Sequence, residues 1–107
     1  VLSQLYADGL MEAVSVKQTE VFEAAEYFAR VEGILPAPES SHAILAAVNE
    51  AKRCRETGEE KTILFGLTGT GYFDLVAYEK FHDGVMSNYV PTDEEIARSL
   101  AQLPVVE

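Results

Sequence analysis

The segment KTILFGL, Lys61 to Leu67, constrains the fold more than any other part of this chain. It is a continuous apolar run with β-branched residues, which suits a strand covered on both faces, as in parallel sheets. Only EAVSV, Glu12 to Val16, offers a second, shorter strand-like pattern. Because a sheet normally needs three or more strands, the chain resembles a piece of a larger α/β domain, or a protomer that completes its sheet with another chain.

The rest of the chain predicts helices. Apolar residues recur with helical spacing over 18–32 and again over about 40–56, and Gly33 and Gly58 follow as helix-ending glycines. Shorter helices are expected at 2–9, 74–82 and about 93–102, the last opened by a capping box of Thr92 and Glu95. We therefore expect an α/β fold with about five helices around two short parallel strands, joined by a right-handed crossover. The expected core is Phe22, Ala25, Phe28, Ile44, Val48, Ile63, Leu64 and Phe65.

Size and charge narrow the possible functions. The length of 107 residues predicts one domain spanning 1–107. A net charge of −10, from 18 acidic and 8 basic residues, argues against nucleic-acid and anionic-membrane partners. The single cysteine, Cys54, cannot form an intramolecular disulfide, and the first ten residues lack the basic region of a signal peptide. A cytoplasmic location is therefore expected.

A glycine-rich loop follows the predicted strand at 61–67. Gly69 and Gly71 precede a predicted helix, and such strand–loop–helix units often cradle a phosphate. The dinucleotide fingerprint G-x-G-x-x-G is incomplete, however, because Asp74 stands at the third glycine position. A tight turn with positive φ is the expected role of these glycines, and a phosphate-binding domain is the least favoured function. Alternatively, Thr68 presents its hydroxyl at the carboxyl end of a strand, where α/β proteins bind ligands.

A second polar cluster, Glu39-Ser40-Ser41-His42, stands before a predicted helix. The favoured interpretation is a helix cap, with Ser40 or Ser41 as the N-cap residue and Glu39 near the positive end of the helix dipole. A nucleophile–base pair is disfavoured, since adjacent helical residues point in different directions. Neither histidine nor the cysteine has zinc-ligand spacing, so no metal site is expected. Four aromatic residues are expected to pack in the core: Tyr72, Phe73, Tyr78 and Phe81.

Taken together with their spacing, two motifs point to a family. EGILPAPESSHA, then a helix, then KTILFGLTGTGYFDL resembles the C-terminal part of tryptophan synthase β chains, which are pyridoxal 5′-phosphate enzymes of fold type II. The resemblance is strongest to the type 2 group, which shares segments like GLxEAV, ETGEEKxILF and an acidic helix like PTDEEIARSLAQLP. It extends from about Leu2 to Val106, nearly the whole chain, and is far more specific than either motif alone.

The resemblance implies a chemistry and a set of site residues. Enzymes of this family join indole to L-serine to give L-tryptophan. Thr68 would face the pyridine nitrogen of the cofactor, at a position where the family usually has serine with the same hydroxyl. Glu39 would flank the ring, and Gly69 and Gly71 would let the loop turn beneath it.

Two family segments are absent from this chain. The family attaches its cofactor to a lysine in an HETGAGQ-type segment and holds the phosphate with a GGGSN-type loop, and neither occurs here. The resemblance therefore implies that this chain contains no catalytic residue. It also implies that pyridoxal phosphate is the cofactor of the parent family, and that this chain alone does not bind it. The expected partner is the N-terminal part of the enzyme or a second copy. The alternative is a non-enzymatic module that completes its sheet by self-association.

Overall fold

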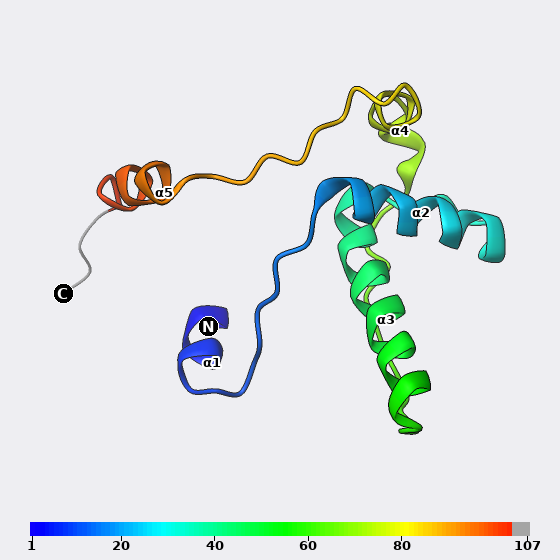
Figure 1. The fold of residues 1–107 in the computed structure, drawn as a ribbon, viewed down its shortest axis with the longest axis horizontal. Coiled ribbons are helices and arrows are strands. Elements are labelled where there is room, and N and C mark those ends of the chain that lie inside the picture. The colour runs from blue at the N-terminus through cyan, green and yellow to red at the C-terminus, as the bar shows by residue number, and fades with distance from the viewer. Residues whose placement is uncertain (104–107) are drawn as a thin grey trace.

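The computed structural model describes residues 1–103, and in that range the fold is helical. In chain order the elements are α1 (Leu2–Ala7), α2 (Gln18–Glu32), α3 (Pro38–Thr57), the 3₁₀ turn η1 (Gly71–Phe73), α4 (Leu75–His82) and α5 (Asp93–Leu100). Helix α2 packs on both α3 and α4, whereas α1 and α5 lie apart at the ends of extended connections (Figure 1). None of the helices between residues 1 and 103 is both long and apolar enough to cross a bilayer.

Helix α2 organises the core because adjacent apolar positions point to two sides. Val21 and Ala24 pack against Ile44 and Leu45 of α3. The next residues in sequence, Phe22 and Ala25, form a second cluster with Tyr78 of α4. The Phe22 and Tyr78 rings meet edge to face with centroids 5.0 Å apart, a geometry that aromatic pairs prefer. The wide apolar stripe of α2 therefore packs against α3 on one side and against α4 on the other.

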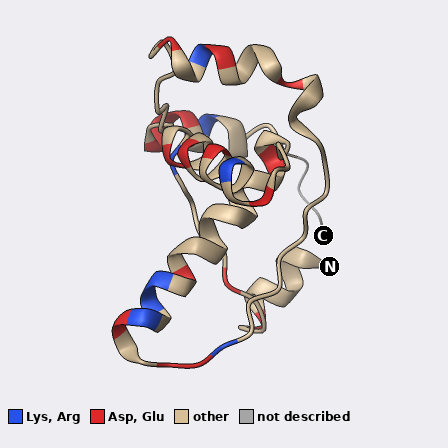
Figure 2. Cartoon of the chain, turned by 90° about the vertical axis from the view of Figure 1, so that its right-hand side faces the viewer, with Lys and Arg blue, Asp and Glu red and all other residues tan. Residues whose placement is uncertain are grey.

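An ionic cluster fixes the chain reversal after α3. The Arg53 and Lys61 nitrogens lie 2.6 and 3.0 Å from Oε1 of Glu50, and the Arg53 guanidinium, followed by Lys61, lowers the pKa of Glu50 to about 2. Figure 2 shows basic residues gathered in the last turns of α3, where cations favour the negative end of the helix dipole. Gly58 then adopts φ 74°, and the following segment runs back along α3.

The helix predictions are confirmed within two residues at most ends. Gly33 takes a left-handed conformation at the end of α2, and the capping box of Thr92 and Glu95 opens α5. Helix α3 begins at Pro38 instead of about Ser40, because proline suits the first helical position, where no amide hydrogen is needed. Helix α5 ends at Leu100, two residues before the predicted end.

The two predicted parallel strands are wrong for the chain as described. Residues 1–103 contain no strand, and both 12–16 and 61–67 are extended without a ladder partner. The physical reason is that strand pairing needs a neighbouring backbone, and these two segments do not approach each other closely enough to exchange hydrogen bonds. The family-level part of the expectation, a fragment of a larger α/β enzyme, is taken up below.

The predicted core is correct for the helices and wrong for part of the apolar run. Phe22, Ala25 and Ile44 are buried. The partly buried side chains of Phe28, Val48 and Phe65 pack against the cluster shared by α2 and α3. Ile63 and Leu64, by contrast, are 36% and 94% exposed, and within residues 1–103 the run packs on the helices through Phe65.

The molecule exposes far more surface than a compact protein of its size. Its accessible area is 8637 Å², against roughly 5900 Å² for a compact monomer of 11.7 kDa. Its radius of gyration is 16.8 Å, against about 13 Å for a compact domain of this length. The difference agrees with a piece whose remaining surface is covered in a larger assembly.

We predict that the 61–67 segment behaves as unpaired backbone in solution. Its amides should exchange with deuterium at rates within about tenfold of an unstructured peptide, because no ladder hydrogen bond protects them. The amides of 20–30 in α2 and 42–54 in α3 serve as the internal control and should exchange much more slowly. Protection at Ile63 to Phe65 comparable with that of α2 would contradict this prediction.

Candidate functional site

The first turn of α3 is joined to the glycine-rich loop by one serine. Ser40 Oγ lies 3.1 Å from the backbone nitrogens of both Thr68 and Gly69 and accepts a hydrogen bond from each. The same oxygen lies 2.9 Å from Oγ1 of Thr68. Ser40 is only 3% exposed, so water does not compete well for these bonds. Two segments 28 residues apart in the sequence are thereby fixed to each other.

Backbone hydrogen bonds extend this junction on both sides. The amide of Ala37 donates to the Gly69 carbonyl at 3.1 Å, and the amide of Gly71 donates to the Leu35 carbonyl at 2.9 Å. Pro36 and Thr70 form an isolated antiparallel bridge between them. The segments 35–37 and 69–71 therefore pair as two very short strands would, although neither is long enough to count as one.

The glycines of this loop allow two backbone segments to approach closely, and they do not adopt a positive φ. The expectation of positive φ is wrong, since the positive-φ glycines are Gly9, Gly33, Gly58 and Gly84. A Cβ added at Gly71 would meet the Pro36 carbonyl oxygen at 2.5 Å, and one added at Gly69 would meet Ala37 Cβ at 3.0 Å. The loop needs glycine because it lies directly against the 35–37 backbone.

The expected helix cap is also wrong in its residues. Ala37 is the N-cap residue of α3, and no side chain caps the helix there. Ser41, fully buried, donates instead to the Ala37 carbonyl at 2.8 Å. Ser40 is occupied by the glycine loop. Glu39 does lie in the first turn, as expected, and its side chain is exposed.

A tyrosine from α4 completes the junction. The hydroxyl of Tyr78 donates to the Pro36 carbonyl at 2.6 Å, and burial raises the pKa of Tyr78, against a smaller opposing effect of Ser41. The prediction that Tyr78 packs in the core is confirmed, as it is for the partly buried Phe81. It is wrong for Tyr72 and Phe73, which are 72% and 91% exposed.

The predicted site residues are thus only partly brought together. Thr68 and Gly69 lie against the first turn of α3, one residue from Glu39, but no hydrogen bond joins Glu39 to either of them within residues 1–103. Ser40 was missed as a site residue because the helix was expected to begin at about Ser40, and a serine at a helix start is typical of capping. Its true partners lie 28 and 29 residues away, so no local signal could have identified it.

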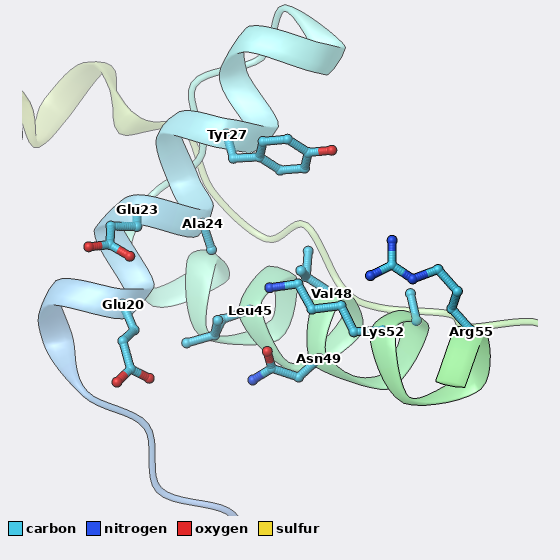
Figure 3. Close-up of a pocket in the computed structure, with 10 residues that line it drawn as sticks. Glu20, Glu23, Ala24, Tyr27, Leu45, Val48, Asn49, Lys52 and Arg55 are labelled. Atoms are coloured by element: carbon cyan, nitrogen blue, oxygen red, sulfur yellow. The ribbon is translucent and has the colours of Figure 1, made fainter. Parts of the chain in front are cut away.

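A groove lies elsewhere on the molecule. It has a volume of about 860 Å³ and lies between α2 and α3, with Ala24, Leu45 and Val48 at its base (Figure 3). A smaller hollow of about 530 Å³ lies where the N-terminal ends of α2 and α3 meet, and Glu39 and His42 line it. Between residues 1 and 103, no three acidic, histidine or cysteine side chains gather as metal ligands would.

The junction can offer hydrogen-bonding groups to a ligand. Thr68 is exposed, and its hydroxyl has no partner other than Ser40 in the described part of the chain. The Thr68 hydroxyl can form a hydrogen bond with a polar atom at the edge of a flat ligand. The exposed carboxylate of Glu39 lies nearby and can contribute a negative charge.

We predict that the close approach at Gly71 contributes to stability. Gly71→Ala should destabilise the chain by about 1–3 kcal/mol, because the new methyl collides with the Pro36 carbonyl and with Leu35. Urea unfolding followed by circular dichroism measures this. Gly66→Ala is the matched control, since a Cβ there meets nothing closer than 3.6 Å, and it should be nearly neutral. Equal stability of the two variants would contradict the geometry described here.

Known proteins match most of this chain. The family model described as pyridoxal-phosphate dependent enzyme matches residues 1–69. Tryptophan synthase beta chain 2 of Aquifex aeolicus is 62% identical over 85 residues, which cover 79% of this chain and 20% of that protein. The protein of the same name from Methanosarcina acetivorans is 60% identical over 84 residues, 78% of this chain and 19% of its own. That from Pyrococcus furiosus is 45% identical over 103 residues, 96% of this chain and 23% of its own.

The chain thus spans about a fifth of the length of the curated relatives it matches. The family match covers more than half of the chain, and the resemblance seen in the motifs agrees with it. On this evidence the chain belongs to the family of pyridoxal-phosphate dependent enzymes.

Proposed function

We propose that this chain is the C-terminal portion of a tryptophan synthase β chain of the type 2 group, and that it forms one wall of the cofactor site. The whole protein would join indole to L-serine to give L-tryptophan. The observation that supports the proposal is the junction of Ser40, Thr68 and Gly69, which holds the Thr68 hydroxyl in a defined place. The family resemblance implies that this hydroxyl faces the cofactor ring. By itself the chain is proposed to be inactive.

In the whole protein the residues of this chain would bind and orient the cofactor. Thr68 would hydrogen-bond the ring nitrogen, and Gly69 would let the backbone lie close to the ring. Glu39 would place its carboxylate beside the ring from the first turn of α3. Bound pyridoxal phosphate supplies the electron sink for chemistry at the amino acid's α-carbon.

The exposed apolar run, residues 61–67, would be buried in the same assembly. Leu64 is 94% exposed here, and Ile63 is 36% exposed. We propose that 61–67 becomes a strand when the N-terminal part of the protein supplies neighbouring strands, as the run's apolar character on both faces requires. The partner of this chain is then the rest of its own enzyme, for which we propose a cytoplasmic location.

The test is a chimera in which this chain replaces the matching segment of the Aquifex aeolicus protein. We predict that the chimera binds pyridoxal phosphate and makes tryptophan from indole and serine. Thr68→Val should weaken cofactor binding about tenfold, since one hydrogen bond is lost, and Thr68→Ser should leave it nearly unchanged. Cofactor absorbance that co-elutes with the protein, with a fluorescence titration, measures binding.

Thr62→Val is the matched control for this experiment. Thr62 is exposed and lies in the same extended segment, outside the junction, so the identical change there should leave binding unaltered. A chimera that folds, as judged by circular dichroism, but does not retain the cofactor would disprove the proposal.

The second candidate is a self-associating module without catalytic function. The large exposed apolar surface favours it, because an unpartnered surface of this kind promotes association. It predicts a dimer or larger species by size-exclusion chromatography with light scattering at micromolar concentration. Leu64→Ser should shift that species towards monomer, whereas Leu103→Ser, at a remote exposed site, should not. A monomer under these conditions counts against this candidate.

A further inference from the structure

We propose that Ser40 is a positioning residue that presents the Thr68 hydroxyl as a hydrogen-bond donor to its ligand. This inference rests on the proposed function for the identity of the ligand, a pyridine ring, and on the structure for the direction of the hydrogen bonds. Sequence reasoning assigned Ser40 to a helix cap. The geometry gives it a different task, which follows from the number of bonds that one hydroxyl can make.

A serine hydroxyl has two acceptor lone pairs and one hydrogen. At Ser40 both lone pairs are used, because the oxygen accepts from the amides of Thr68 and Gly69 at 3.1 Å each. Backbone amides can only donate, so the direction of these two bonds is fixed. The third close atom, Thr68 Oγ1 at 2.9 Å, must then be the acceptor of the Ser40 hydrogen.

The direction of the hydrogen bond from Ser40 to Thr68 determines whether the Thr68 hydroxyl donates a hydrogen bond to a ligand or accepts one. Its oxygen receives a hydrogen from Ser40, so its own hydrogen is not used in that bond and points away from it. No other protein group within residues 1–103 accepts that hydrogen. A hydroxyl that accepts one hydrogen bond becomes a stronger donor and a weaker acceptor, because hydrogen bonds in a chain polarise one another. Ser40 therefore biases Thr68 towards donating.

Burial shields the hydrogen bonds of Ser40 from water. Ser40 is 3% exposed and Ser41 beside it is fully buried, so the donor–acceptor directions are set inside the protein and not by solvent. Thr68, one step further out, is exposed and can reach a ligand. The partner atom that suits a donor is an unprotonated ring nitrogen. Ser40, which does not touch the ring, would thus act on its protonation through Thr68.

The first part of the test uses the 107-residue chain without cofactor. Ser40→Ala should speed the amide exchange of Thr68 and Gly69 about tenfold, measured residue by residue by NMR, since each loses its acceptor. Ser41→Ala is the matched control: the Ser41 hydroxyl donates to the Ala37 carbonyl, and within residues 1–103 it accepts from neither the Thr68 nor the Gly69 amide, so both amides should be unchanged. If Ser40→Ala does not fold, Thr68→Val decides: both amides should stay protected, because Ser40 still accepts from them. Unchanged exchange of both amides in a folded Ser40→Ala chain, or exposure of both amides in a folded Thr68→Val chain, overturns the assignment.

The second part uses the chimera loaded with pyridoxal phosphate carrying ¹⁵N at the ring nitrogen. In the parent and in Thr68→Ser the ¹⁵N shift should report an unprotonated ring at neutral pH. In Ser40→Ala the protonated fraction at a given pH should rise about tenfold, a change that a merely structural residue would not produce.

Different results would overturn the positioning role of Ser40 and the proposed function. Identical ¹⁵N titrations of Ser40→Ala and the parent, with cofactor bound in both, would overturn the positioning role of Ser40 and leave the proposed function standing. Failure of the parent chimera to bind the labelled cofactor would overturn the proposed function and, with it, the ring as the ligand of Thr68. The amide-exchange result tests the hydrogen-bond directions in either event.

Discussion

The hydrogen bonds accepted by Ser40 are the interaction on which the arrangement of this chain depends. They hold the glycine-rich loop against the first turn of α3, and the backbone bonds of Ala37 and Gly71 extend that contact. Tyr78 then joins α4 to the same place through the Pro36 carbonyl. Because Tyr78 also packs on Phe22 of α2, the three central helices meet around one polar junction with an apolar core beside it.

The junction is closely hydrogen-bonded, whereas much of the rest of the molecule is exposed. Helices α2, α3 and α4 share buried contacts, whereas α1, α5 and the 61–67 run present apolar side chains to solvent. A chain that had evolved to fold alone would cover such surface, since exposed apolar patches promote association. The contrast supports our proposal that the chain is one segment of a longer protein, whose other parts would cover this surface and complete a site at the junction.

Local sequence signals were sufficient for the helices and insufficient for the site. Glycine at 33 and 58, the capping box at Thr92 and the apolar period of α2 each act within a few residues, so their outcomes could be predicted. The family resemblance singled out Thr68, Gly69 and Glu39 as site residues. The structure places the first two in the junction with Ser40. The importance of Ser40 could not be predicted, because its partners lie far away in the sequence.

The sequence by itself determined the family, the helices and the apolar character of the 61–67 run, since these depend on residue type and local spacing. Only the tertiary structure decided what the glycines and serines do. Gly71 is needed because a Cβ would strike the Pro36 carbonyl, not because of its φ, and Ser40 bonds a loop instead of capping a helix. The predicted strands did not form for a related reason. A strand is a relation between two backbones, and the apolar pattern of one segment cannot supply the second backbone.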